Sequence, residues 1–187
     1  TIRTIDPQDE VPKLLREQRI DLAVSHRDFD DPMIVSELCL NFEMVAVVRR
    51  DHPRIRNAPT IEALDREEYV SVHDFSCSTN TQDLRQLMDI ARNRSRMEVP
   101  NALMLPVILE RSDLMALIPR VHADVMAERY NLAIFPLPLQ KVVSHANLLW
   151  HRAFEKDPSL VWFRESCLLT FQEIRNRLES LYPDIRQ

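Results

Sequence analysis

The chain of 187 residues contains no glycine. An average glycine content of about 7% would give roughly thirteen in a chain of this length. Glycine is needed where a loop wraps a phosphate or where a nucleophile sits on a sharp turn, because it takes positive φ and close backbone approach without steric cost. The P-loop, the dinucleotide-binding fingerprint and the nucleophile elbow all require it, so all are excluded.

Turns in this chain must be made by other residues. After glycine, asparagine and aspartate accept the left-handed backbone conformation most readily. We therefore predict left-handed conformations at breaks in the hydrophobic pattern, which carry Asn57, Asn93, Asn131 and the Asp30-Asp31 pair.

The rest of the composition is that of an ordinary globular domain. Hydrophobic residues make up 45% of the chain and charged residues 28%, and no apolar run approaches the ~18 residues that span a bilayer. The net charge of -5 provides no basic field for nucleic acid. We expect neither a membrane partner nor DNA contact through this chain itself.

Cysteines and histidines are too dispersed for a metal site or a disulfide framework. Cys39, Cys77 and Cys167 are odd in number and far apart, which favours reduced thiols, and no pair of residues has zinc-ligand spacing. We expect no metal and no cofactor. A thiol nucleophile at Cys77 beside His73 is the one catalytic interpretation. Since no third group orients it, we predict that the chain is not an enzyme.

Hydrophobic periodicity predicts strands that alternate with helices over most of the chain. The predicted strands are 1–5, 20–24, 34–40, 44–48, 69–72, 97–99, 114–118, 132–135 and 146–150. Helices are predicted at 11–15, 61–64, 84–91, 101–109, 120–129 and from 158 onward. This alternation favours an α/β fold with mostly parallel sheets, two rather than one. Because 1–5 alternates like a strand and unlike an export signal, a cytoplasmic location is expected.

Two N-caps and one buried helix face are also predicted. Thr60 is expected to cap the helix at 61–64, and Asp157 to cap the last helix, which has Pro158 in its first turn. The last helix is expected to bury an apolar stripe made of Trp162, Phe163, Cys167, Phe171, Ile174, Leu178 and Leu181.

An ordered series of motifs resembles one family. The motifs are Ile20-Asp21-Leu22-Ala23-Val24, Met44-Val45-Ala46-Val47-Val48 with Asp51-His52-Pro53, Pro59-Thr60-Ile61-Glu62-Ala63-Leu64, Glu110-Arg111-Ser112-Asp113-Leu114 with Ile118-Pro119-Arg120, Leu137-Pro138-Leu139, and Leu148-Leu149-Trp150-His151 ahead of Asp157-Pro158. In this order they resemble the effector-binding domain of LysR-type transcriptional regulators. The Trp150-His151 strand end and the turn at 136–138 are most similar to the branch of nodulation and aromatic-degradation regulators.

This resemblance implies an α/β fold of two Rossmann-like lobes joined by two crossover strands, similar to type II periplasmic binding proteins. The first lobe would comprise residues 1–43 with 151–187, and the second residues 44–150. We expect the first strand and helix of the family's domain, and its N-terminal winged helix-turn-helix, to be absent from this sequence.

A ligand pocket between such lobes would be lined by loops at the carboxyl ends of strands, where helix N-termini offer N–H donors. The candidate effector-binding residues are Ser25, His26, His73, Ser76, Ser78, Thr79, Pro100, Asn101, Ala102 and His151. A histidine can bond a carboxylate or a phenol. The alternative for His26 and His73 is an exposed loop imidazole, and the alternative for His151, which could sense lobe closure, is a satisfied surface histidine. The hydroxyls and Asn101 have helix capping or turn closure as the alternative, and His52 is expected to be structural.

The expected function is to sense a small organic effector, carboxylated or aromatic, that shifts the arrangement of subunits in a homodimer or homotetramer. DNA would be bound only through the absent N-terminal domain. The alternative is a periplasmic-type solute-binding protein with the same fold.

Overall fold

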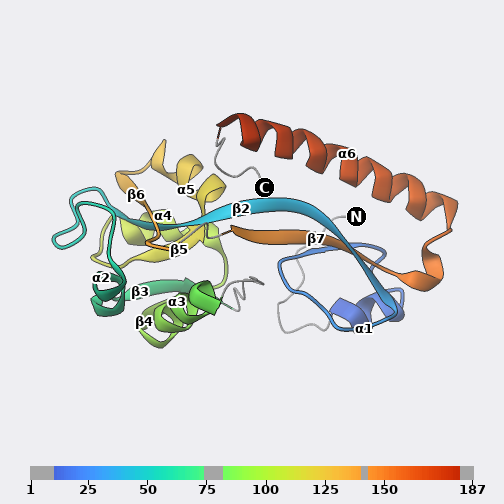
Figure 1. Ribbon diagram of the computed structural model, residues 1–187, viewed down its shortest axis with the longest axis horizontal. Coiled ribbons are helices and arrows are strands. Elements are labelled where there is room, and N and C mark those ends of the chain that lie inside the picture. The colour runs from blue at the N-terminus through green and yellow to red at the C-terminus, as the bar shows by residue number, and fades with distance from the viewer. Residues whose placement is uncertain (1–10, 74–81, 140–142, 182–187) are drawn as a thin grey trace. The chain divides into compact units, whose positions relative to one another are not determined.

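The computed structural model of the protein describes residues 11–73, 82–139 and 143–181 (Figure 1). The helices are α1 (Val11–Arg16), α2 (Ile61–Arg66), α3 (Gln82–Asn93), α4 (Leu105–Leu109), α5 (Arg120–Ala127) and α6 (Pro158–Leu181), with 3-10 turns η1 (Ala102–Met104) and η2 (Arg152–Phe154). The strands are β1 (Ala23–Ser25), β2 (Ile34–Arg49), β3 (Tyr69–Val72), β4 (Ser95–Val99), β5 (Ala116–Pro119), β6 (Leu132–Pro136) and β7 (Val143–His151). The predicted strand at 1–5 lies outside the described residues.

The chain divides into two compact units. Unit 1 is Thr1–Asn41 with His145–Gln187, and unit 2 is Phe42–Ser144. Strand β2 contributes residues to both units, because the predicted strands 34–40 and 44–48 form one strand without a break. Asn41 and Glu43, between the two predicted strands, stay extended and partly buried, and from Met44 to Val48 the strand is buried on both faces.

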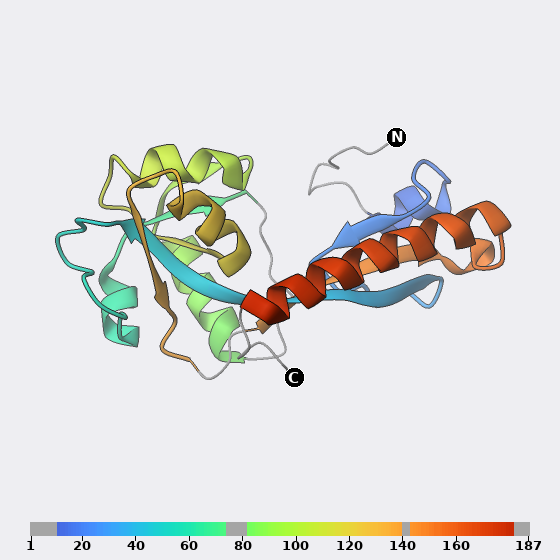
Figure 2. The same ribbon diagram turned by 90° about the horizontal axis from the view of Figure 1, so that it is seen from above.

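Unit 1 has an apolar cluster on each face of its sheet. Strand β1 pairs antiparallel with β7, with Ala23 opposite Leu149. Leu149 packs with Ala23, Leu15 of α1 and Ile34, whereas its neighbour Leu148 packs with Cys39 and Trp150. Successive strand residues point to opposite faces. Helix α1 therefore contributes to one face, and α6, which runs alongside the strands of this unit in Figure 2, contributes to the other.

Helix α1 ends in a left-handed residue that is not the one predicted. The backbone N–H of Arg19 donates to Leu14 O over 3.0 Å, and that of Gln18 to Leu15 O over 3.3 Å. This is the Schellman pattern, which requires positive φ at its central residue. Gln18 has φ of 55° and is the only described residue with positive φ. The predicted left-handed turns at Asn57, Asn93, Asn131 and Asp30-Asp31 are therefore wrong.

Helix α6 begins as predicted but buries a different face. Oδ1 of Asp157 accepts from the N–H of Ser159 and Leu160 over 3.0 and 3.1 Å, which confirms the N-cap. Cys167, Leu168 and Phe171 pack toward the Cys39 and Trp150 cluster.

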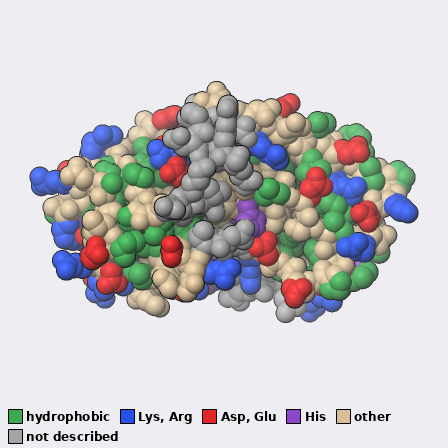
Figure 3. All heavy atoms as spheres, in the orientation of Figure 1, with side chains coloured by type: hydrophobic (Ala, Val, Ile, Leu, Met, Phe, Trp, Pro, Cys, Tyr) green, Lys and Arg blue, Asp and Glu red, His purple; other side chains and the backbone are tan. Residues whose placement is uncertain are grey.

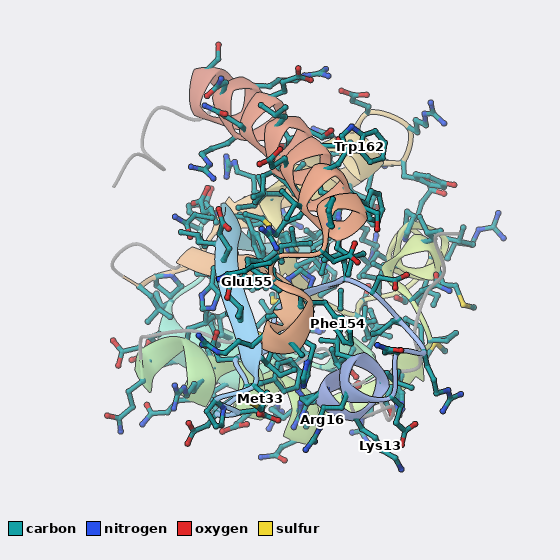
Figure 4. All side chains as sticks on the ribbon, turned by 90° about the vertical axis from the view of Figure 1, so that its right-hand side faces the viewer. Lys13, Arg16, Met33, Phe154, Glu155 and Trp162 are labelled. Atoms are coloured by element: carbon teal, nitrogen blue, oxygen red, sulfur yellow. The ribbon has the colours of Figure 1, made fainter. Side chains whose placement is uncertain are left out.

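Trp162, Phe163 and Ile174 of the predicted α6 stripe do not face that cluster, and the side chains of Leu178 and Leu181 lie outside the described residues. Trp162 is 69% exposed, and Phe163 and Ile174 are exposed too; Figure 4 shows Trp162 on the outer part of α6. Consecutive helix residues differ by ~100° around the axis, so Trp162 and Phe163 could not both share one stripe with Phe171. Two cationic side chains lie on the sheet side instead: Arg164 stacks 4.5 Å from the Trp150 ring, and Arg175 donates to Cys39 O over 2.9 Å.

Unit 2 mixes antiparallel and parallel pairing. Strand β2 pairs antiparallel with β5 and with β6, with Ala46 opposite Leu117 and Phe135. Strand β3 pairs parallel with β4. The expectation of mostly parallel sheets is therefore met by β3 and β4 but not by the pairings of β2 or of β1 with β7. A continuous apolar run shows burial on both faces but not the direction of the neighbouring strands.

A buried polar network closes the loop after β2. Nδ1 of the fully buried His52 accepts from the N–H of Ile55 over 2.9 Å, and its Nε2 lies 3.0 Å from Asp113 O. The buried Glu67 pairs with Arg54 over 2.7 Å. These contacts support the structural role expected of His52. Thr60 caps α2 as predicted, since its Oγ1 accepts from Ala63 N–H over 3.2 Å.

The charges on the surface are mixed in sign. Figure 3 shows acidic and basic side chains interspersed over the face in view.

Among the helices of the described residues, none is long and apolar enough to cross a membrane. Within the same residues, no group of His, Cys, Asp or Glu side chains is arranged to hold a metal ion.

Candidate functional site

Three polar side chains, those of Asp28, His145 and Asn147, meet beside the end of β1 in unit 1, next to Ser25, whose Oγ accepts from the N–H of Arg27 over 3.0 Å. Ser25, the last residue of β1, lies opposite Asn147 of β7. Asp28 follows three residues later, and its Oδ1 accepts from His145 Nε2 over 2.9 Å and from Asn147 Nδ2 over 3.1 Å. We call Ser25, Asp28, His145 and Asn147 the β1-end cluster.

The sheet places this cluster on one face. Residues two apart in a strand share a face, so Ser25 and Asn147 share the face on which Ala23 and Leu149 are packed in the apolar core. The same face is thus apolar at Ala23 and polar at Ser25. Asn147 is buried, with 7% of its surface exposed, and such a side chain needs hydrogen-bond partners. The predicted candidate His26 follows directly and is partly buried.

Three predicted candidates in unit 2 lie at a common sheet edge. Strands β3 and β4 are parallel, so their carboxyl ends lie together. His73 follows β3; its N–H donates to Val99 O over 2.7 Å, and its Nδ1 lies 3.0 Å from Glu98 Oε1. Pro100 and Asn101 follow β4, so the structure brings them to the same edge as His73.

Asn101 and Ala102 are engaged in local structure. Oδ1 of Asn101 accepts from the N–H of Leu103 over 3.1 Å and so caps η1. Ala102 packs against the core cluster of unit 2. The Asn101 side chain therefore closes a turn, which was the alternative to ligand binding. Its Oδ1 is used in this turn, so a ligand would be bound by its amide nitrogen, Nδ2.

His151 has a capping role at the end of β7. Its Nδ1 accepts from the N–H of Ala153 over 3.3 Å, which caps η2, and its ring lies 5.8 Å from the ring of Phe154. Nearby, the N–H and Nε of Arg152 donate to Met33 O and Pro32 O over 2.8 and 3.0 Å. These bonds hold η2 against the residues that directly precede β2. Figure 4 labels Phe154, the last residue of η2, and Glu155, which follows it.

The remaining candidates, Ser76, Ser78 and Thr79, lie outside the described residues, as does Cys77. The two described thiols are poor nucleophiles. Burial raises the pKa of the Cys39 thiol to about 11 and also raises the pKa of Cys167. The reactive form of a thiol is the thiolate, so neither residue can supply much of it near neutral pH.

Of the β1-end cluster, sequence reasoning found only Ser25, together with the neighbouring His26. It missed Asp28, His145 and Asn147. The signal for Asn147 was present, since it is a polar residue inside the apolar run 146–150 and such a residue needs a buried partner. Nothing in the local sequence pairs it with Asp28, which is 119 residues away.

Comparison with known proteins decides the family. The family described as the LysR substrate binding domain matches residues 3–172, which is well over half of the chain. The chain belongs to this family. It therefore has the type II periplasmic-binding-protein-like fold of LysR regulatory domains, in agreement with the α/β fold predicted.

Relatives of this LysR domain carry regulator names. The transcriptional activator NahR of Pseudomonas putida is 28% identical over 151 residues, which cover 81% of this chain and 50% of that protein. The transcriptional regulator PhcA of Ralstonia nicotianae is 27% identical over 157 residues, covering 80% of this chain and 45% of that protein. The LysR domain thus spans about half the length of these relatives. Both are regulators rather than enzymes, which agrees with the expectation that the chain is not an enzyme.

Solved structures agree on the fold. The regulatory domain of MexT from Pseudomonas aeruginosa superposes with a TM-score of 0.66 at 19% identity, covering 86% of this chain and 76% of that chain. The effector binding domain of QuiR in complex with shikimate gives a TM-score of 0.67 at 17% identity, covering 87% of this chain and 77% of that chain. At these identities the likeness establishes the fold alone.

Proposed function

We propose that this LysR domain senses a small organic effector, carboxylated or aromatic, and that unit 1 binds it at the β1-end cluster with His26. The observation that carries the proposal is the switch from apolar to polar on one sheet face. Ala23 and Leu149 pack in the core, and two residues along the same strands Ser25 faces Asn147. In open α/β sheets, ligands bind beyond the carboxyl ends of parallel strands. In this protein the change occurs at the carboxyl end of β1, whose partner β7 runs antiparallel to it.

The chemistry of the cluster suits a carboxylate. His145 Nε2 and Asn147 Nδ2 already donate to one carboxylate oxygen, that of Asp28. Two donors that converge on one oxygen, one of them buried, hold an anionic ligand more strongly than exposed donors, because water competes less. The structure of the QuiR effector binding domain with shikimate, which carries one carboxylate, supports this choice of ligand class.

In unit 2 the same proposal assigns a contribution to His73, Pro100, Asn101 and Ala102. His73 and Asn101 bring an imidazole and an amide to one sheet edge, and Glu98 holds the imidazole in place over 3.0 Å. Ser76, Ser78, Thr79 and His151 stay predictions of the sequence.

The proposed regulator has further parts. We take unit 1 as lobe I and unit 2 as lobe II of an effector-binding domain in a cytoplasmic homodimer or homotetramer. The lobes predicted from the sequence, 1–43 with 151–187 and 44–150, divide the chain at nearly the same places. DNA would be read by a segment outside this sequence. The effector acts through its different affinities for the two subunit arrangements. Sedimentation of the chain as a strict monomer that binds a solute would instead favour the solute-binding alternative.

A thermal-shift screen tests the proposed function. The wild type is heated with a panel of small aromatic and aliphatic acids, including shikimate and benzoate, because a ligand of the native state raises the melting temperature by mass action. His26→Ala is expected to lose most of the shift that the best acid produces. Asn176→Ala, on the exposed side of α6, is the control and should keep it. Equal shifts in both variants, or no shift of the wild type with any acid, would contradict the proposal.

A further inference from the structure

An acidic side chain of the protein occupies the donors assigned to the effector. Asp28 Oδ1 is the shared acceptor of His145 Nε2 at 2.9 Å and Asn147 Nδ2 at 3.1 Å. The two ends of this contact differ in burial. The Asp28 side chain is 61% exposed, whereas that of His145 is 16% exposed and Asn147 is buried.

We infer that Asp28 is an internal competitor, whose carboxylate is displaced from His145 and Asn147 by the carboxylate of the effector. The inference rests on the proposed function and adds to it a ligand class and a regulatory residue. Without ligand, His145 Nε2 and Asn147 Nδ2 donate to Asp28. With the effector bound, both donate to the effector carboxylate, and the segment that carries Asp28 is released.

The difference in burial determines which group moves. A buried donor without an acceptor is unfavourable, so the Asn147 amide keeps an acceptor in either state. A largely exposed carboxylate regains its hydration when it leaves, so release of Asp28 costs little. Two carboxylates cannot share the donors, because like charges in contact disfavour each other's ionised form. The effector therefore replaces Asp28 and does not bind beside it.

The displacement has a structural consequence. Asp28 lies in the segment 26–30, which has no regular secondary structure. In this segment Arg27 lies 6.0 Å over the Phe29 ring, and Phe29 packs against the core cluster of Leu15 and Leu149. Releasing Asp28 frees one of the anchors of this segment, so effector binding changes its position. A regulator needs such an element, whose equilibrium the ligand shifts.

If Asp28 instead bound the effector directly, removal of its charge would change the effector affinity in the opposite direction. If Asp28 stayed in place and accepted a hydroxyl or amine of the effector, removing its charge would weaken binding. If Asp28 competes, removing its charge strengthens the binding of a carboxylate. The sign of one affinity change therefore separates the two.

Calorimetric titration with benzoate and with the uncharged benzamide measures that sign. Asp28→Asn keeps an acceptor oxygen of the same shape but weakens the competition, so benzoate affinity should rise about tenfold, which equals one charge-assisted hydrogen bond of ~1.4 kcal/mol. The affinity for benzamide should change much less. Asp30→Asn, in the same segment, removes the same charge and should leave both affinities unchanged. Asp28→Ser is a second variant should the amide distort the cluster.

Each result assigns the outcome to one idea. Tighter benzoate binding by Asp28→Asn and not by Asp30→Asn supports the competition. An affinity that is unchanged or lower in Asp28→Asn, or raised equally in Asp30→Asn, overturns the competition and leaves the proposed function standing. If none of the proteins binds benzoate or any acid of the screening panel, the proposed function itself fails.

Discussion

Gln18→Gly should stabilise the protein, because Gln18 holds the one positive φ among the described residues. An L-residue in the left-handed region costs ~1–2 kcal/mol, owing to the contact between Cβ and the following carbonyl. Glycine removes that cost but adds ~0.4–1 kcal/mol of unfolded-state entropy. The net gain is about 0.5–1 kcal/mol. For a chain of this size that raises the melting temperature by about 1–3 °C.

The assay is urea unfolding followed by circular dichroism, with the melting temperature as a second measure. Glu17→Gly is the matched control. It places glycine one residue earlier, where φ is not positive, so it should lower stability by about 0.5–1 kcal/mol. Gln18→Asn should fall between the wild type and Gln18→Gly. If Gln18→Gly is no more stable than the wild type, the Schellman geometry at the end of α1 is not a source of strain.

Further predictions concern the buried polar groups and thiols. His52→Leu should cost about 2–4 kcal/mol in urea unfolding, since Ile55 N–H and Asp113 O lose their partner; an unchanged midpoint would refute the network. Burial raises the pKa of the Asp124 carboxyl, and within the described residues no hydrogen-bond partner reaches its Oδ2. The native state thus binds this proton more readily than the unfolded state, so Asp124→Asn should raise the melting temperature at pH 7.5. The gain should shrink as the pH falls toward the ordinary pKa of 3.8 and vanish below it, where both states are protonated. In a Cys77→Ser/Cys167→Ser background, Cys39 should react with a thiol reagent only as fast as the protein unfolds, because it is fully buried with a pKa of about 11; prompt labelling in native buffer would contradict this.

The local elements could be predicted from the sequence because local forces decide them. Thr60 and Asp157 cap their helices since a hydroxyl or carboxylate beside free N–H groups satisfies them in any context. The apolar run 44–48 forms a buried strand because all five of its side chains are apolar. Strand direction was not predictable, because the partners of β2 come from 116–119 and 132–136 and hydrophobicity is the same for either orientation.

The predicted buried face of α6 and the predicted left-handed turns differ from the structure for physical reasons. The α6 stripe was drawn from apolar identity alone, whereas Arg164 and Arg175 reach the sheet side with their long stems and charged ends. The left-handed position was assigned to asparagines by propensity. The Schellman hydrogen bonds placed it at Gln18, because the geometry of the helix end fixes φ there whichever residue occupies the position.

The candidate site shows why function is harder to predict than structure. Ser25 and Asn147 face each other only because Ala23 pairs with Leu149; a register shift of one residue would turn Asn147 to the other face of the sheet. Asp28 then reaches Asn147 across 119 residues of chain. The buried asparagine demands a partner, but the register decides which carboxylate supplies it. If that carboxylate can be exchanged for one from solution, the register that satisfies the fold also makes the protein responsive to its ligand.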